Sequence, residues 1–182
     1  MFERRGFTLL EVMVTISIIA ILASIIYMSF GEARENARNK ALTVELKEVQ
    51  LALETYRAQT GSFPLPAAPC QVTDAGELYA TDNTCSTPYI SNLVPEFISA
   101  LPSSADSGND NCNIEYRTDT TGSWFKLIAI NCLSGVDATT GVGPNEPLAR
   151  CSNVCDPVGR CDPTTPDYYQ SVAVYSLGGQ CE

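Results

Sequence analysis

The 182-residue sequence contains no histidine. Histidine is the commonest general base near neutral pH and a common metal ligand, so conventional Ser-His-Asp or Cys-His catalysis is excluded within this chain. Trp124, Tyr168 and Tyr169 could line a pocket, but no nucleophile–base pair stands out in the sequence. We therefore expect the protein not to be an enzyme.

Proline is missing from residues 1–62, and charge is almost missing from the segment between Phe7 and Phe30. Those 24 residues include one charged side chain, that of Glu11. A helix rises about 1.5 Å per residue, so this segment can cross a hydrocarbon core of about 30 Å. Because a lone carboxylate in a membrane span is costly, it is a functional residue by default and needs a partner. We predict a membrane-spanning helix over residues 7–30.

Basic residues are scarce in the C-terminal part of the chain. Residues 58–182 contain four Lys or Arg and fourteen Asp or Glu, whereas residues 1–57 contain seven of each. The whole net charge of −10 therefore belongs to the C-terminal part. An acidic surface repels phosphate backbones, so we expect no direct contact with nucleic acid.

Neither glycine nor proline occurs between Glu32 and Gln59. Apolar residues recur there at spacings of 4, 3, 4 and 3, namely at Leu42, Leu46, Val49, Leu53 and Tyr56. This pattern predicts an amphipathic helix over residues 31–60 that continues the first one. Gly61 and Pro64 then predict its end. Two heptads are short for a coiled coil, so we expect the apolar stripe to pack on a globular head of residues 61–182.

Cysteine is absent from the first 69 residues, and all eight cysteines lie in the head. They are Cys70, Cys85, Cys112, Cys132, Cys151, Cys155, Cys161 and Cys181. An even number beyond a membrane anchor indicates disulfides in an oxidising compartment. Arg4 and Arg5 agree, because positive charge stays cytoplasmic and the head then faces outward. The alternative, a metal site at the cluster from Cys151 to Cys161, lacks histidine and an assigned fourth ligand, so we expect no metal there.

Two alternating segments, 112–116 and 126–132, flank Gly122 and predict an antiparallel hairpin. If Gly122 is its centre, Tyr116 faces Ile128, Ile114 faces Ile130, and Cys112 faces Cys132. Directly opposed residues have Cα atoms about 4.5–5.5 Å apart, within disulfide reach. We therefore predict a Cys112–Cys132 bond.

Other disulfides are less determined by the sequence. Cys70–Cys85 is the simplest local pair, and Cys181 is expected to tie the C-terminus to the cysteine-rich loop. The pairing of Cys151, Cys155, Cys161 and Cys181 stays open. The sequence thus predicts an α+β fold, in which a long N-terminal helix packs on a small, disulfide-rich antiparallel sheet.

Three stretches are expected to be irregular. Residues 70–88 and 134–167 are rich in turn-forming residues. Residues 106–111 are rich in oxygen ligands but fail the spacing of an EF-hand, so we expect a solvated loop rather than a calcium site.

The N-terminal residues Gly6-Phe7-Thr8-Leu9-Leu10-Glu11, followed by the apolar run, resemble the N-terminus of type IV pilins and type II secretion pseudopilins. In that superfamily a prepilin peptidase removes a short basic leader after the glycine and N-methylates the new terminal residue. The resemblance implies loss of residues 1–6, cleavage between Gly6 and Phe7, and methylation of Phe7. It also implies that Glu11 meets the amine of a neighbouring subunit during assembly. The alternative is an ordinary signal anchor with a stray glutamate.

Two further segments resemble pseudopilins. The run from Tyr56 to Pro64 is similar to their helix exit, and Tyr175-Ser176-Leu177-Gly178-Gly179 is similar to their closing strand. Many type IV pilins have a proline late in the apolar segment, where this chain has Met28.

The resemblance implies a structural subunit of a type IV pilus or a type II secretion-like pseudopilus. Its partners would be copies of itself and other pilins or pseudopilins, the prepilin peptidase, an inner-membrane assembly platform and the lipid bilayer. It would cross the inner membrane once, with its N-terminus in the cytoplasm, before joining an extracytoplasmic filament. A membrane-anchored binding module or adhesin that does not polymerise is the alternative. The machine, and whether the subunit is major or minor, stay open.

Overall fold

The computed structural model describes residues 7–181. Residues 7–35 form one unit and residues 36–181 form a second, and each is described by itself. The predicted leader, residues 1–6 with Gly6, lies outside the described residues.

The helix α1 runs without interruption over Leu9–Thr60. It begins two residues later than predicted, because Thr8 caps its first turn with its side chain and so lies outside the helix. It ends as the sequence predicts. Gly61 has φ of 90°, in the left-handed region that favours glycine, and its N–H donates to the Arg57 carbonyl.

The first unit consists of the apolar part of α1. Its described side chains from Phe7 to Arg34 are all exposed. Among residues 7–181, α1 is the one helix that is long and apolar enough to cross a membrane. A helix that is apolar on every side needs lipid or other helices around it.

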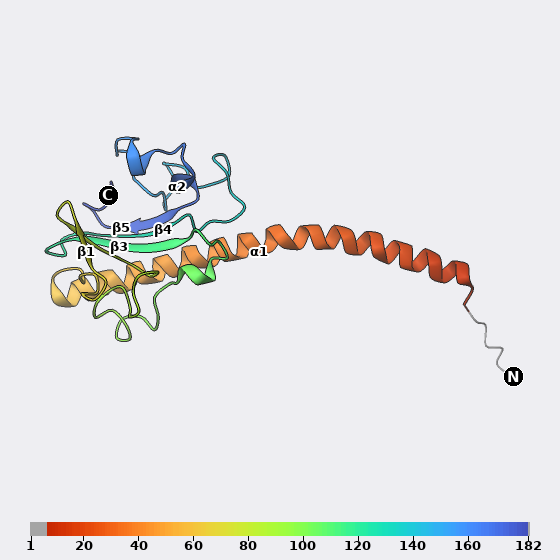
Figure 1. The fold of residues 1–182 in the computed structure, drawn as a ribbon, viewed down its shortest axis with the longest axis horizontal. Helices are drawn as coiled ribbons and strands as arrows, with labels where there is room; N and C mark the ends of the chain where they lie inside the picture. The colour runs from red at the N-terminus through yellow and green to blue at the C-terminus, as the bar shows by residue number, and fades with distance from the viewer. Residues whose placement is uncertain (1–6, 182) are drawn as a thin grey trace. The chain divides into compact units, whose positions relative to one another are not determined.

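The second unit contains a five-stranded antiparallel sheet in which each strand pairs with the next, in the order β1-β2-β3-β4-β5 (Figure 1). The strands are β1 Val72–Asp74, β2 Glu77–Thr81, β3 Asn113–Asp119, β4 Phe125–Ile130 and β5 Val172–Tyr175. Short helical turns complete the unit: η1 Ser104–Asp106, η2 Gly159–Cys161 and α2 Pro166–Tyr169.

The C-terminal part of α1 covers one face of this sheet (Figure 1). Leu46, Val49 and Leu53 on the predicted apolar stripe are completely buried. They share one core with the inward-facing sheet residues Ile114, Tyr116, Leu127, Ala129, Val172 and Val174. The Tyr116 hydroxyl also donates to the Pro64 carbonyl at 2.7 Å, just after the helix exit. The structure therefore confirms the predicted α+β fold, with the helix packed on the sheet.

The predicted hairpin register is wrong by one residue. Tyr116 pairs with Leu127 rather than Ile128, and Ile114 pairs with Ala129 rather than Ile130. A shift of one residue moves a strand's side chains to the other face, so Ile128 does not share a face with Tyr116. The loop between β3 and β4 causes the difference. It has six residues, between the paired Thr118 and Phe125, so the centre of the hairpin falls between two residues and not on Gly122.

The Cys112–Cys132 disulfide is nevertheless present, with Cα atoms 4.4 Å apart. In the observed register, continuation of the strands would place Asn131 opposite Cys112. Asn131 instead has φ of 55°, a left-handed conformation that asparagine tolerates. This turn brings Cys132 to Cys112 directly after β4.

The segment 70–88, expected to be loop, contains the β1–β2 hairpin. Its two-residue turn, Ala75-Gly76, has φ of 51° and 92°, which suits a tight hairpin connection. Alanine seldom adopts positive φ, so the usual Asn-Gly or Asp-Gly signal is missing from the sequence. The Cys70–Cys85 disulfide closes this segment and corresponds to the local pair expected from the sequence.

The second face of the sheet lies beneath the C-terminal segment that contains α2 (Figure 1). Two disulfides that the sequence leaves open hold this segment together, Cys151–Cys161 and Cys155–Cys181. The Tyr168 hydroxyl donates to the Cys151 carbonyl at 3.1 Å, and both residues are buried. All eight cysteines are therefore in disulfides, including those of the cluster considered for a metal.

Charged side chains are buried on this second face. Arg117 forms ion pairs with Glu115 and Glu77, and Lys126 is completely buried. Burial lowers the pKa of the Arg117 guanidinium, but its hydrogen bonds to Glu115 and then to Glu77 outweigh burial and raise the pKa. Both faces of the central strands are therefore covered.

We predict that Leu46→Ala lowers the free energy of unfolding by about 3 kcal/mol, since it leaves a cavity under α1. The matched control is Leu51→Ala on the same helix, where the leucine is 69% exposed and we expect almost no change. Chemical denaturation of the detergent-solubilised full chain, followed by fluorescence of the single tryptophan Trp124, measures both. Equal effects of the two substitutions would contradict this packing of α1.

Candidate functional site

The first turn of α1 is the candidate site. The Thr8 side-chain oxygen accepts from the Glu11 N–H at 3.2 Å. In return, Glu11 Oε2 accepts from both the Thr8 N–H and the Thr8 hydroxyl, each at 2.9 Å. This reciprocal arrangement is a capping box, in which residues three apart satisfy the otherwise unpaired N–H groups of a helix start.

The capping box uses only one oxygen of the carboxylate. Glu11 Oε1 has no hydrogen-bond partner among residues 7–181. The carboxylate also lies in the first helical turn, where the helix dipole favours negative charge. Glu11 is therefore fixed at one oxygen while the other can accept a donor from another molecule.

The surroundings of Glu11 are apolar and open. A hollow of about 510 Å³ on the helix surface is lined by Phe7, Leu10, Glu11, Val12, Val14 and Thr15. Phe7 is 88% exposed and precedes the helix. A carboxylate in an apolar environment loses its hydrogen bonds to water, which is costly. A hydrogen-bond donor that reaches Oε1 would compensate for that loss.

The comparison with protein families bears on these residues. Residues 1–27 match the model of the prokaryotic N-terminal methylation motif. This match confirms the resemblance that Gly6 to Glu11 carry. It covers the predicted leader and the first part of α1, and therefore the whole candidate site.

Proteins named type II secretion system core protein G are similar to part of the chain. The one from Klebsiella pneumoniae is 34% identical over 64 residues, 35% of this chain and 46% of that protein. The one from Pectobacterium carotovorum subsp. carotovorum is 32% identical over 63 residues, 35% of this chain and 40% of that protein. The one from Escherichia coli strain K12 is 34% identical over 62 residues, 34% of this chain and 43% of that protein.

The chain thus spans less than half the length of these curated relatives. No solved structure matches the chain. The similarity to core protein G agrees with the pseudopilin side of the sequence resemblance.

None of the other predicted site residues belongs to the first turn of α1. Gly6 is outside the described residues, so cleavage after it stays a prediction. Asn109, from the oxygen-rich stretch, donates to the Asn131 carbonyl at 2.7 Å and accepts from the Asn111 N–H at 3.1 Å. Within residues 7–181, no three Cys, Asp or Glu side chains come together in a way that could hold a metal ion.

Thr8 is the residue of this site that the sequence analysis did not single out. Thr8-Leu9-Leu10-Glu11 fits the pattern of a threonine followed three residues later by a glutamate at a helix start. The signal was therefore present in the sequence. It gives Glu11 a role within its own chain in addition to any role between subunits.

Proposed function

We propose that the protein is a structural subunit of a filament of the pilus or pseudopilus type, and that it catalyses no reaction. The match of residues 1–27 to the N-terminal methylation motif carries this proposal. The exposed apolar part of α1 supports it, because helices of this kind need lipid before assembly and neighbouring helices after it. The relatives' name, type II secretion system core protein G, favours a secretion-type pseudopilus.

Before assembly, the subunit spans the inner membrane once through residues 7–30. Its N-terminus is cytoplasmic, as Arg4 and Arg5 require, and the disulfide-bonded head of residues 61–182 lies outside. A prepilin peptidase cleaves between Gly6 and Phe7 and methylates the Phe7 amine. An inner-membrane platform then adds the subunit to a filament of its own copies and related subunits.

During assembly, the Phe7 ammonium of one subunit binds the Glu11 carboxylate of the next. Leaving either charge unpaired in an apolar environment is costly, so the pairing selects the axial position at which both are neutralised. Glu11 Oε1, which has no partner among the described residues, is the oxygen available for this contact. An anchored module that does not polymerise would need neither the cleavage motif nor this carboxylate.

We predict that Gly6→Ala blocks maturation, because the peptidase recognises the residue before the cleaved bond. Intact-mass analysis of protein extracted from membranes should show wild-type chain without residues 1–6 and with one added methyl group. Gly6→Ala should keep the full-length mass. A wild-type chain that retains all six leader residues in its native host would contradict the proposed function.

We predict that Glu11→Gln and Glu11→Ala both abolish incorporation into filaments, while the head stays folded. Glutamine can keep the capping box but carries no charge, so this variant removes only the attraction for an ammonium group. The matched control is Thr8→Val, which removes the hydroxyl of the capping box and keeps the Glu11 charge. We expect it to assemble almost normally. The amount of each variant in sheared or sedimented filaments is the measurement.

Assembly of Glu11→Gln at the wild-type level would show that Glu11 serves only to cap the helix. If Thr8→Val also lost assembly while Glu11→Gln assembled normally, the capping box and not the Glu11 charge would be needed, and the proposed contact would be contradicted.

A further inference from the structure

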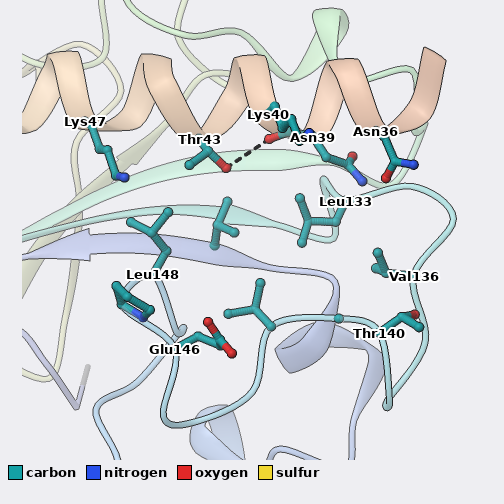
Figure 2. Close-up of a pocket in the computed structure, with 14 residues that line it drawn as sticks. Asn36, Asn39, Lys40, Thr43, Lys47, Leu133, Val136, Thr140, Glu146 and Leu148 are labelled. Atoms are coloured by element: carbon teal, nitrogen blue, oxygen red, sulfur yellow. Dashed lines mark hydrogen bonds between the residues drawn. The ribbon is translucent and has the colours of Figure 1, made fainter. Parts of the chain in front are cut away.

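Two hollows flank α1 where it crosses the sheet: two lysines lie on the α1 wall of the first, and three carboxylates line the second. The first, of about 460 Å³, lies between α1 and residues 133–148. Figure 2 shows Lys40 and Lys47 on the α1 wall of this hollow, with Leu133, Val136 and Leu148 and the carboxylate of Glu146 across from them. Within residues 7–181, neither lysine has a hydrogen-bond or ion-pair partner. We call Lys40 and Lys47 the lysine edge.

The second hollow, of about 230 Å³, lies on the other side of α1. Its acidic side chains are those of Glu45, Glu48 and Asp106, which we call the acidic edge, and Ile98 and Leu101 are among its apolar ones. None of the three carboxylates has an ion-pair partner within the part of the chain that the structure describes.

The carboxylates of the acidic edge disfavour one another. Burial, and then the charges of Asp106 and Glu48, raise the pKa of Glu45. Arg38 lines an adjacent hollow with Glu45 and Asp106 and lies against Gly108, and it forms no ion pair with either carboxylate within residues 7–181. An external cation would therefore relieve a repulsion that the protomer leaves in place.

The exposed face of α1 lies between the two edges. Successive residues turn by about 100° around a helix, so Lys40 and Lys47 lie on one side of Val44, and Glu45 and Glu48 lie on the other. Val44 is 54% exposed, and Leu51, two turns further on, is 69% exposed. A partner that covers this face gains apolar burial at the centre and can pair charges at both margins.

The lysine edge offers an acidic partner two lysines that form no ion pair within the described residues. The head is strongly acidic, and three of its four cations, Arg117, Lys126 and Arg150, are buried. The fourth, Arg160, lies 3.9 Å from Asp74. The remaining lysines of the chain are Lys40 and Lys47.

We propose that the lysine edge of one protomer binds the acidic edge of a second copy of this chain, with Val44 and Leu51 in the contact. The inference rests on the proposed filament function and names the residues that orient the heads in it. Because the two edges are different surfaces, a pair of bound copies still has one free lysine edge and one free acidic edge, to which further copies can bind. Such a head-to-tail contact generates an open array rather than a closed dimer.

Charge reversal tests the proposal in full-length chains. K40E/K47E gives a protomer with two acidic edges, and E45K/E48K gives one in which lysines replace two of the three carboxylates of the acidic edge. Each variant alone should yield at least about tenfold less filament than wild type, because like charges then meet at every contact. Co-expression of the two should restore assembly, since acidic and basic protomers can alternate. The control E96K/D156K reverses two exposed carboxylates outside both edges and should assemble normally.

Zero-length carbodiimide coupling in wild-type filaments gives a second measurement that does not depend on variants. Mixed isotope-labelled and unlabelled chains should yield linked peptides that join Lys40 or Lys47 of one chain to Glu45, Glu48 or Asp106 of another. Coupling of these lysines to a different protein would overturn the proposal.

Two further results distinguish this inference from the function on which it rests. If wild type and K40E/K47E assemble equally, the contact between edges is wrong and the filament function stands. If the mature wild-type chain never forms filaments, both are wrong.

Discussion

The main constraint on this protein is the exposed apolar surface of the first part of α1, which needs an apolar environment around it. A soluble monomer does not expose such a helix, because covering apolar surface is the main favourable term in folding and association. The chain has no element among residues 7–181 that buries it. Lipid and neighbouring helices are the environments that can. Within that apolar surface one carboxylate, Glu11, is fixed at the helix start by Thr8 and still has an unused oxygen.

The second part of α1 has a different role, because it packs on the sheet of the head. Its apolar stripe completes the core of the head, so the helix with the exposed apolar first part is also the helix on which the sheet packs. The opposite face of the sheet carries buried charges and is covered by a segment with little regular structure, which two disulfides restrain. Lysine and acidic edges remain on either side of the helix. In this account, Glu11 sets the axial position of a subunit and the two edges orient its head.

Much of this could be predicted from the sequence, since long apolar runs and helical spacing are strong local signals. The helix, its amphipathic second part and its end at Gly61 follow from them. The hairpin register does not, because Glu115, Lys126 and Ile128 are buried on the second face as well, so alternation does not tell the two faces apart.

Other features depend on conformation or on distant segments. Ala75 takes a positive φ without a sequence signal, and the Cys151–Cys161 and Cys155–Cys181 pairs depend on how an irregular segment closes. The capping box could have been recognised at Thr8, because its spacing is local. The complete acidic edge could not, because Asp106 joins Glu45 only in the folded head.

The central claim is the contact between Glu11 of one subunit and the mature N-terminus of another. Solid-state NMR on filaments assembled from two populations tests it directly, with glutamate ¹³C-labelled in one and phenylalanine ¹⁵N-labelled in the other. The account predicts a cross peak between a glutamate carboxylate carbon and the terminal Phe7 amine nitrogen, present only in the mixed sample and absent in Glu11→Gln. Filaments that give no such peak, although Phe7 is the mature terminus, would contradict it.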